Sequence, residues 1–102
     1  MGREIEMVKM VVINYIKAEC VEDYLTIAKE LVEKTNALDS GCIKYELCKD
    51  ANDPLRFVTL EEWESQAALD AHIKAKHCEE LIPKLRTFSA KPTEMIQLEK
   101  MF

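Results

Sequence analysis

The sequence predicts a single α+β domain whose elements follow the order β-α-β-β-α-β. Three observations point to this order. Two segments repeat apolar residues at helical spacing, four segments are rich in β-branched residues or alternate in polarity, and a cluster of turn residues separates the two middle strands. The chain has 102 residues, 48% of them hydrophobic, which suits one domain with its own core.

The first strand is expected at Met7–Lys17, where Val, Ile and Tyr are frequent. Alternation places apolar side chains on both faces of this strand, with Asn14 as a polar residue on one of them. The helices of a small domain cover only one face of its sheet. We therefore expect a partner or a pocket to cover the other face.

A long helix is expected at Glu22–Leu38, because apolar residues recur there at helical spacing: Tyr24, Ile27, Ala28, Leu31, Val32 and Leu38. Glu22 and Asp23 favour the positive end of the helix dipole. Gly41 is expected to end this segment as a C-cap glycine.

A β-hairpin is expected next, with strands at Ile43–Lys49 and Arg56–Trp63. The first of these alternates and carries Tyr45. The turn residues "DANDP" at Asp50–Pro54 predict a loop of about five residues between the strands.

The second helix is expected to be split into two pieces. Ser65 suits the N-cap of the first piece. The second piece is expected over residues 77–85, where Pro83 limits or kinks its end. Thr93–Phe102 alternates again and is expected to form the last strand.

This order of elements predicts a ferredoxin-like βαββαβ fold, an antiparallel sheet with helices on one face. Residues 1–102 are expected to form one domain, and residues 1–6 are left as a candidate flexible tail. The sequence contains no internal repeat or low-complexity linker.

Charge and hydropathy argue against two classes of partner. The net charge of −5 is unsuited to nucleic acid, whose phosphates require clustered Lys and Arg. The longest wholly apolar run, Met10–Ile13, is far too short to span a membrane. Met1–Lys9 lacks the apolar core of a secretory signal.

The four cysteines, Cys20, Cys42, Cys48 and Cys78, form no C-x-x-C pair. Without a recognisable export signal, we expect reduced thiols and a cytoplasmic protein. Cys48 is expected to pack in or beside a strand, as buried free cysteines do.

The stretch "WESQAALDAHIKAKH" holds the only tryptophan, Trp63, and both histidines. His72 has the pKa range of a general base near neutral pH, although a surface histidine or a hydrogen-bonded buried one is the alternative. His77 lies about 140° further around an ideal helix, so both rings meet one ligand only if the helix breaks near Ala75. A metal site would need i,i+4 spacing or inward carboxylates, and none is expected.

The same stretch, Trp63–His77, fits the pattern W-x-S-x(3)-A/L-x(2)-H-x(4)-H at the junction of the third strand and second helix. A βαββαβ chain of this length with this pattern resembles the antibiotic biosynthesis monooxygenase (ABM) family. "DSGCIKYEL" (Asp39–Leu47) and "FVTLEEW" (Phe57–Trp63) are similar to the family's helix-to-strand passage and third strand. The resemblance covers about Met7 to Phe102.

This resemblance implies a homodimer in which the open sheet faces meet, a dimeric α/β barrel, with a pocket between sheet and helices in each subunit. Characterised monooxygenases of the family oxidise phenols or hydroquinones with O₂ and use no metal, flavin or haem. The deprotonated substrate itself supplies the electrons. The implied partners are therefore a small aromatic substrate and O₂, with no cofactor.

Five residues become candidates for the site. Asn14, His72 and Trp63 are the catalytic candidates: the amide would stabilise an oxyanion, the imidazole would move a proton, and the indole would wall the pocket. Tyr45 and His77 are the candidate substrate-binding residues. Each also has a plain structural role available, such as a core tryptophan or an ordinary tyrosine of an amphipathic sheet.

Other functions stay open. Haem-degrading relatives share the fold, but His72 stands where their tryptophan would be and Ile82 lies at or near their iron ligand, so haem degradation is not expected. An isomerase or processing enzyme for a small sugar-derived signal, such as an autoinducer breakdown product, would need Arg56 or Lys44 in the pocket to hold a phosphate. A non-catalytic ligand-binding dimer is favoured if Asn14 and His72 do not reach one cavity.

Overall fold

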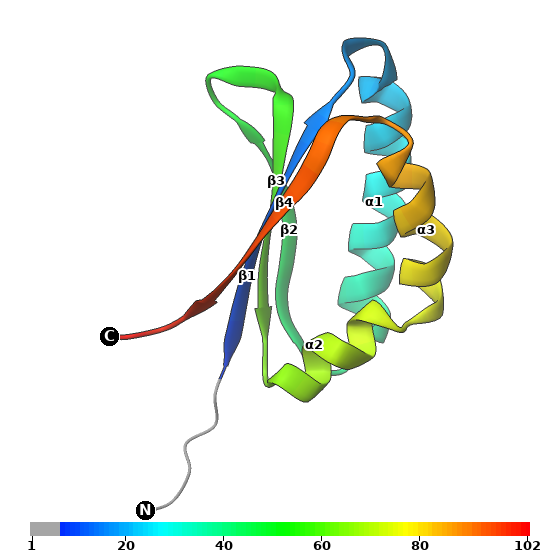
Figure 1. The fold of residues 1–102 in the computed structure, drawn as a ribbon. Helices are drawn as coiled ribbons and strands as arrows, with labels where there is room; N and C mark the ends of the chain where they lie inside the picture. The colour runs from blue at the N-terminus through cyan, green and yellow to red at the C-terminus, as the bar shows by residue number, and fades with distance from the viewer. Residues whose placement is uncertain (1–6) are drawn as a thin grey trace, which may run out of the picture.

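The computed structural model describes residues 7–102 and confirms the predicted ferredoxin-like fold (Figure 1). The candidate tail, residues 1–6, lies outside the described residues. Four strands form one antiparallel sheet in the order β2-β3-β1-β4. The elements in chain order are β1 (Val8–Ile16), the 3₁₀ turn η1 (Ala18–Cys20), α1 (Val21–Leu38), β2 (Cys42–Asp50), β3 (Asp53–Trp63), α2 (Gln66–Ile73), α3 (Lys76–Arg86) and β4 (Ser89–Glu99).

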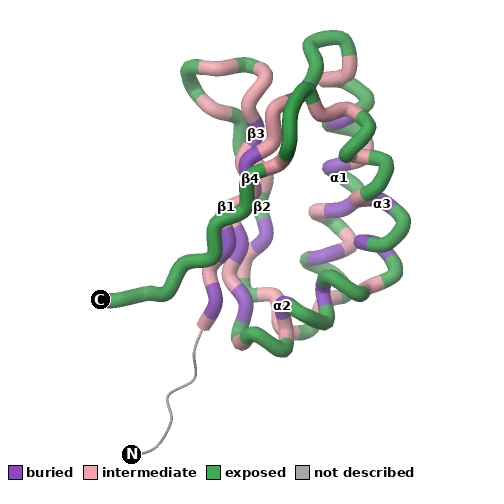
Figure 2. Tube along the Cα trace, viewed as in Figure 1, coloured by how far each residue is buried: buried purple, intermediate pink, exposed green. Residues whose placement is uncertain are grey.

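The helices lie on one face of the sheet, and the buried residues gather in the layer between helices and sheet (Figure 2). One cluster of buried side chains includes Trp63 and Leu31. A second includes Tyr24 and Phe57, whose ring centroids lie 5.2 Å apart. Within residues 7–102, no helix combines the length and the apolar character needed to cross a membrane.

The opposite face of the sheet carries no helix in the described chain (Figure 1). The strand register places Val11 beside both Leu60 and Ile96, and Ile13 beside Val58. Because successive side chains of a strand point to opposite faces, these residues share the side away from the helices. We call this surface the open face; its apolar residues are Val11, Ile13, Val58, Leu60, Ile96 and Leu98.

The hairpin between β2 and β3 is tighter than the expected loop of about five residues. Asp50 pairs with Asp53, so only Ala51 and Asn52 form the turn. The Asp50 carboxylate accepts the backbone N–H of Asn52 at 2.7 Å, an Asx turn that the sequence pattern did not specify. Pro54 fits inside β3 because the pairing with β1 begins only at Arg56.

The last strand begins earlier than expected, at Ser89 rather than Thr93, and ends at Glu99. It includes Pro92, which an edge strand tolerates because one of its sides lacks a hydrogen-bonding partner. The register with β1 shifts between Ile13 and Tyr15, so Pro92 and Thr93 together oppose Asn14. This bulge redirects the strand beside a residue that the sequence had marked as a site candidate.

The prediction of Gly41 as a left-handed C-cap is wrong, because no glycine in residues 7–102 has a positive φ. Helix α1 ends instead at Asp39, which has extended backbone and whose N–H donates to the Thr35 carbonyl. A Cβ at Gly41 would collide with the side chain of Ala68. Gly41 therefore allows α2 to pack closely against the chain that leaves α1, which places Asp39 near α2.

Candidate functional site

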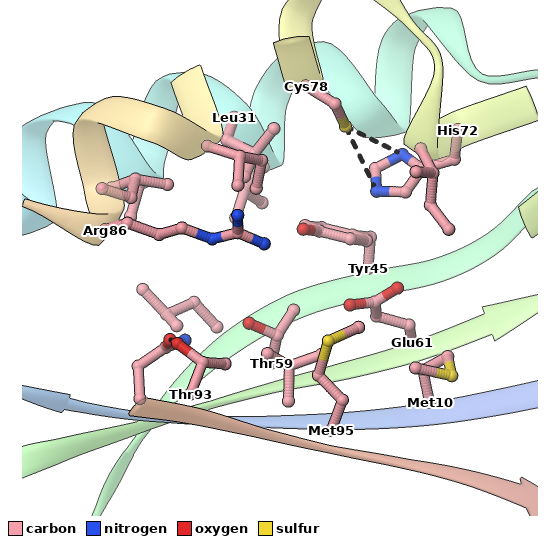
Figure 3. Close-up of a pocket in the computed structure, with 18 of the residues that line it drawn as sticks. Met10, Leu31, Tyr45, Thr59, Glu61, His72, Cys78, Arg86, Thr93 and Met95 are labelled. Carbon is pink, nitrogen blue, oxygen red and sulfur yellow. Dashed lines mark hydrogen bonds between the residues drawn. The ribbon is translucent and has the colours of Figure 1, made fainter. Parts of the chain in front are cut away.

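A cavity of about 380 Å³ lies between the sheet and the helices (Figure 3). Its wall is mainly apolar, with residues such as Met10, Leu31, Leu69 and Met95. This volume is in the range of pockets that bind small organic molecules. The polar side chains of its wall, with the Cys78 thiol included, are Asn14, Tyr24, Tyr45, Thr59, Glu61, His72, Cys78, Arg86 and Thr93.

Asn14 lines this cavity from late in β1. The β4 bulge brings Thr93 opposite it, and the Thr93 hydroxyl donates to Asn14 Oδ1 at 2.7 Å. Burial raises the pKa of Tyr24 to about 12, while a side-chain hydrogen bond with Asn14 offsets part of that rise. The amide oxygen of Asn14 is thus already bonded, which turns its NH₂ group toward Tyr24 and the cavity.

Glu61 is a cavity residue that was not among the candidates predicted from the sequence. It pairs with Met10 across β1 and β3, is only 6% exposed, and lines the cavity. Burial raises the pKa of its carboxyl group to about 7, although a hydrogen bond from the Trp63 indole at 3.0 Å opposes the rise. A carboxyl group poised near neutrality in an apolar cavity is suited to proton transfer.

Trp63 takes a different position from the one expected. It is completely buried, does not line the cavity, and gives its N–H to Glu61 rather than to the cavity. Its ring packs against that of His72, with the two ring centroids 4.5 Å apart. Trp63 therefore contacts Glu61 and His72 on their sides away from the cavity.

Tyr45 lines the cavity from β2 and pairs across the sheet with Glu61. Its ring lies 5.2 Å from that of His72 and 6.2 Å from that of Trp63. Burial, together with the negative charge of Glu61, raises the pKa of the Tyr45 hydroxyl. At neutral pH this hydroxyl keeps its proton and can donate a hydrogen bond.

The helix does break between the two histidines. Helix α2 ends at Ile73 and α3 begins at Lys76, with Ala75 in an extended conformation between them. As a result both imidazoles reach one carboxylate oxygen, Asp39 Oδ2. His72 Nδ1 lies 2.6 Å from it and His77 Nε2 lies 3.0 Å from it. His77 does not line the cavity, so it contacts Asp39 instead of the cavity space.

The hydrogen bond to Asp39 fixes the orientation of His72. With the Nδ1 proton donated to the carboxylate, Nε2 keeps a free lone pair. Burial lowers the pKa of His72, although the Asp39 hydrogen bond and charge oppose this effect. His72 is therefore neutral near pH 7 and lines the cavity as a potential proton acceptor.

The buried thiol is Cys78, whereas Cys48 is exposed on β2, contrary to expectation. Cys78 Sγ lies 3.5 Å and 3.4 Å from the two ring nitrogens of His72, which places the sulfur over the ring face (Figure 3). Burial, with the charges of Asp39 and Glu61, raises the pKa of this thiol to about 12. Cys78 is thus a protonated thiol rather than a nucleophile.

His72, His77 and Cys78 place their potential ligand atoms within 4.8 Å of one another. A metal bound by all three would have to replace the hydrogen bonds of Asp39 and bring the sulfur into the plane of the His72 lone pairs. The arrangement present is instead a hydrogen-bonded one, with Asp39 as the shared acceptor.

Comparison with known proteins decides the family. The model of the antibiotic biosynthesis monooxygenase family matches residues 7–84. The chain belongs to this family. A crystal structure of an antibiotic biosynthesis monooxygenase has 32% sequence identity and a TM-score of 0.88, covering 92% of this chain and 98% of that one. A conserved protein from Methanosarcina mazei Go1 has 31% identity and a TM-score of 0.91, covering 95% of both chains.

Two curated relatives of this ABM chain are more distant. YcnE of Bacillus subtilis is 27% identical over 82% of this chain and 87% of its own length. The uncharacterized protein sll1783 of Synechocystis is 28% identical over 78% of this chain. That match covers 54% of sll1783, so the chain spans about half the length of this relative.

In this ABM protein, Asn14 and His72 line one cavity but lie at opposite ends of it. Glu61 and His72 belong to the buried end, near α2. Asn14 lies four residues beyond Met10, the partner of Glu61, which corresponds to about 13 Å along β1. One small substrate atom therefore cannot touch both residues, and an aromatic molecule would have to lie between them.

Proposed function

We propose that this chain is a cofactor-independent monooxygenase that oxidises a small phenol or hydroquinone with O₂. The proposal rests on one observation above all: a mainly apolar cavity in which the Glu61 carboxyl, with a pKa of about 7, lies at the same end as the neutral imidazole of His72. Membership of the ABM family supports it.

The first step is removal of a phenolic proton. Glu61 accepts this proton, and His72 Nε2, oriented by Asp39, is the second proton acceptor at this end of the cavity. The protonated hydroxyl of Tyr45 donates a hydrogen bond to the oxyanion that forms. Glu61 and His72 are each only 6% exposed, so the electron-rich anion that forms beside them meets O₂ at the end of the cavity least accessible to water.

The overall reaction balances without an added reductant. A hydroquinone and O₂ give a hydroxyquinone and water: one oxygen atom forms a C–O bond, and the O–O bond breaks to release the other as water. The substrate loses four electrons and O₂ gains them. The protein binds the ring, moves protons and excludes water, while the substrate supplies the electrons.

Asn14 contributes at the other end of the cavity, where its NH₂ group orients the part of the substrate remote from Glu61. Trp63 acts through Glu61 and His72 as a positioning residue, and His77 acts through Asp39. These positions differ from direct substrate contact, which was the expectation for Trp63 and His77.

The test is oxygen uptake with a panel of hydroquinones and catechols, measured for the unmodified protein, Glu61→Gln and Glu62→Gln. Glu62 neighbours Glu61 on β3 but pairs with Lys9 on the open face, so it is the matched control. We expect uptake in the unmodified protein and in Glu62→Gln, and a loss of about tenfold or more in Glu61→Gln. Equal rates in all three proteins would contradict the proposal.

An anaerobic arm separates this activity from the alternative isomerase, because only the oxygenase stops without O₂. The isomerase on a phosphorylated substrate would need Arg56 or Lys44 in the cavity. Neither lines it; Arg56 lies over the ring of Tyr15 and near Asp50, while Lys44 pairs with Glu46. Substrate binding without any turnover would favour the non-catalytic ligand-binding dimer.

The proposal includes a homodimer formed through the open face. Val11, Leu60 and Ile96 lie side by side there without a covering helix, and Ile96 is 45% exposed. A second copy would cover this apolar surface, as the two apolar faces of β1 require. The four free thiols are compatible with a reducing compartment, and a cytoplasmic location completes the proposal.

A further inference from the structure

Arg86 is the cationic residue of the cavity wall. It is the last residue of α3, and its side chain extends over the cavity on the side of Thr93 (Figure 3). Within residues 7–102, no carboxylate forms an ion pair with Arg86. The guanidinium group is therefore available to an anion that enters the cavity.

The neighbouring Asn14 amide is also able to donate a hydrogen bond. Thr93 and Asn14 line the same end of the cavity, and the Thr93 hydroxyl occupies the Asn14 amide oxygen. The donor of the pair is therefore the Asn14 NH₂ group: one of its N–H groups serves the Tyr24 hydroxyl, and the second remains for a ligand. The surrounding wall is apolar and includes Val12 and Met95. Arg86 itself is exposed, so its preference for an anion comes from its charge and its paired N–H donors rather than from burial.

The two ends of the cavity thus differ in charge. Glu61 places a carboxyl group at the buried end, which repels a second anion once it ionises. Arg86 brings a fixed positive charge from the Thr93 side of the cavity toward the Tyr45 hydroxyl, while Glu61 lies beyond Tyr45 on the side of His72 (Figure 3). A molecule with one acidic arm is therefore held in a single orientation.

Resting on the proposed function, we infer that the substrate is an aromatic carboxylate that also carries phenolic hydroxyls. Arg86 binds the carboxylate with help from Asn14, and the hydroxylated ring lies toward Glu61 and Tyr45. Arg86 is then the residue that determines specificity, because a neutral hydroquinone of the same size lacks its ion pair.

The test measures binding rather than turnover, by calorimetry under anaerobic conditions so that no ligand is oxidised. The ligands are homogentisate, a hydroquinone with an acetate arm, and its neutral methyl ester. The proteins are the unmodified chain, Arg86→Gln and Lys84→Gln. Lys84 is an exposed cation of the same helix that does not line the cavity, so it controls for a general change of charge.

We expect the unmodified chain and Lys84→Gln to bind homogentisate about tenfold or more tightly than the ester, and Arg86→Gln to bind both ligands equally weakly. Arg86→Lys should recover part of the preference, because lysine keeps the charge but loses the bidentate geometry. If the unmodified chain binds both ligands equally, or if Arg86→Gln keeps the preference, the inference about the carboxylate is overturned while the aromatic pocket survives. If neither ligand binds, the proposed function fails together with it.

Discussion

The Trp63 indole donates a hydrogen bond of 3.0 Å to the Glu61 carboxylate and thereby opposes the effect of burial on that group. Replacing Trp63 by Phe removes the donor while keeping an aromatic ring next to His72. The pKa of Glu61 should then rise above about 7, so less of the group is ionised at neutral pH. We expect the acidic limb of the pH profile of kcat/KM to move to higher pH. If this limb does not move, the group that titrates in it is not Glu61.

Glu61 also makes folding stability depend on pH. Its pKa rises from 4.5 when unfolded to about 7 when folded, so the folded chain binds more protons between these values. Stability from this group is fully present below pH 4.5 and is lost as pH rises through about 7, by about 3 kcal/mol in total. Glu61→Gln should flatten this part of the profile.

The measurement for this prediction is the free energy of unfolding in urea, taken across the same pH range for the unmodified protein and Glu61→Gln. Glu62→Gln is again the control, because Glu62 lies on the open face. A decline that stays as steep in Glu61→Gln would assign it to other groups.

Asp39 should support activity through His72. Asp39→Asn keeps the size of the side chain but removes the charge that holds the imidazole with its Nδ1 proton. In Ser-His-Asp enzymes, the same change at the carboxylate that orients the histidine favours the wrong tautomer and lowers kcat, so a loss of about tenfold or more is expected here. We expect a lower kcat with little change in KM, and a changed proportion of the two His72 tautomers by nitrogen NMR.

Asp70→Asn is the control for this variant, because Asp70 is an exposed carboxylate of α2 that accepts a hydrogen bond from Gln66 and does not line the cavity. Normal kcat in Asp39→Asn would mean that the carboxylate has a structural role alone.

Gly41→Ala should destabilise the fold. The new methyl group would collide with Ala68, and neither backbone can move freely because Gly41 also accepts the Glu64 N–H at 2.9 Å. Overpacking of this kind costs about 1–3 kcal/mol in the free energy of unfolding. Ser40→Ala changes a neighbouring exposed position and should stay within about 0.5 kcal/mol of the original protein in denaturant unfolding.

The open face can be tested by sedimentation. Ile96→Glu places a charge on this apolar surface, beside Val11, whereas Leu25→Glu places one on a solvent-exposed position of α1 with similar exposure, 40% against 45%. If a second copy covers the open face, the first variant should be a monomer and the second should remain a dimer. Dimers of both variants would locate the interface elsewhere.

Much of this architecture could be predicted because the spacing of apolar residues and the residue types at caps are local properties of the sequence. The alternation of β1 identified two apolar faces, and Ser65 caps α2 by accepting the Ala68 N–H, as its position indicated. The end of α1 was different, since Gly41 is needed for contact with Ala68, a residue distant in sequence. A glycine selected for close packing and one selected for a left-handed turn look alike in a sequence.

The site was predictable only in part, for a similar reason. Alternation along β3 places Glu61 on the same face as Trp63, so the expectation of a buried Trp63 could have brought Glu61 into view. Asp39 carried no comparable signal, because its contact with the histidines depends on the break after Ile73 and on how α2 packs. Arg86 similarly depends on where the end of α3 lies over the sheet.

The bulge at Pro92 constrains which mutations this protein can accept during evolution. Beyond it, Met95 faces the ligand space while Ile96 faces the opposite side, and a slip of one residue along β4 would exchange the two. An insertion or deletion in this strand would therefore change the cavity wall and the open face in the same event. A substitution changes one side chain at a time, so it can alter either surface alone.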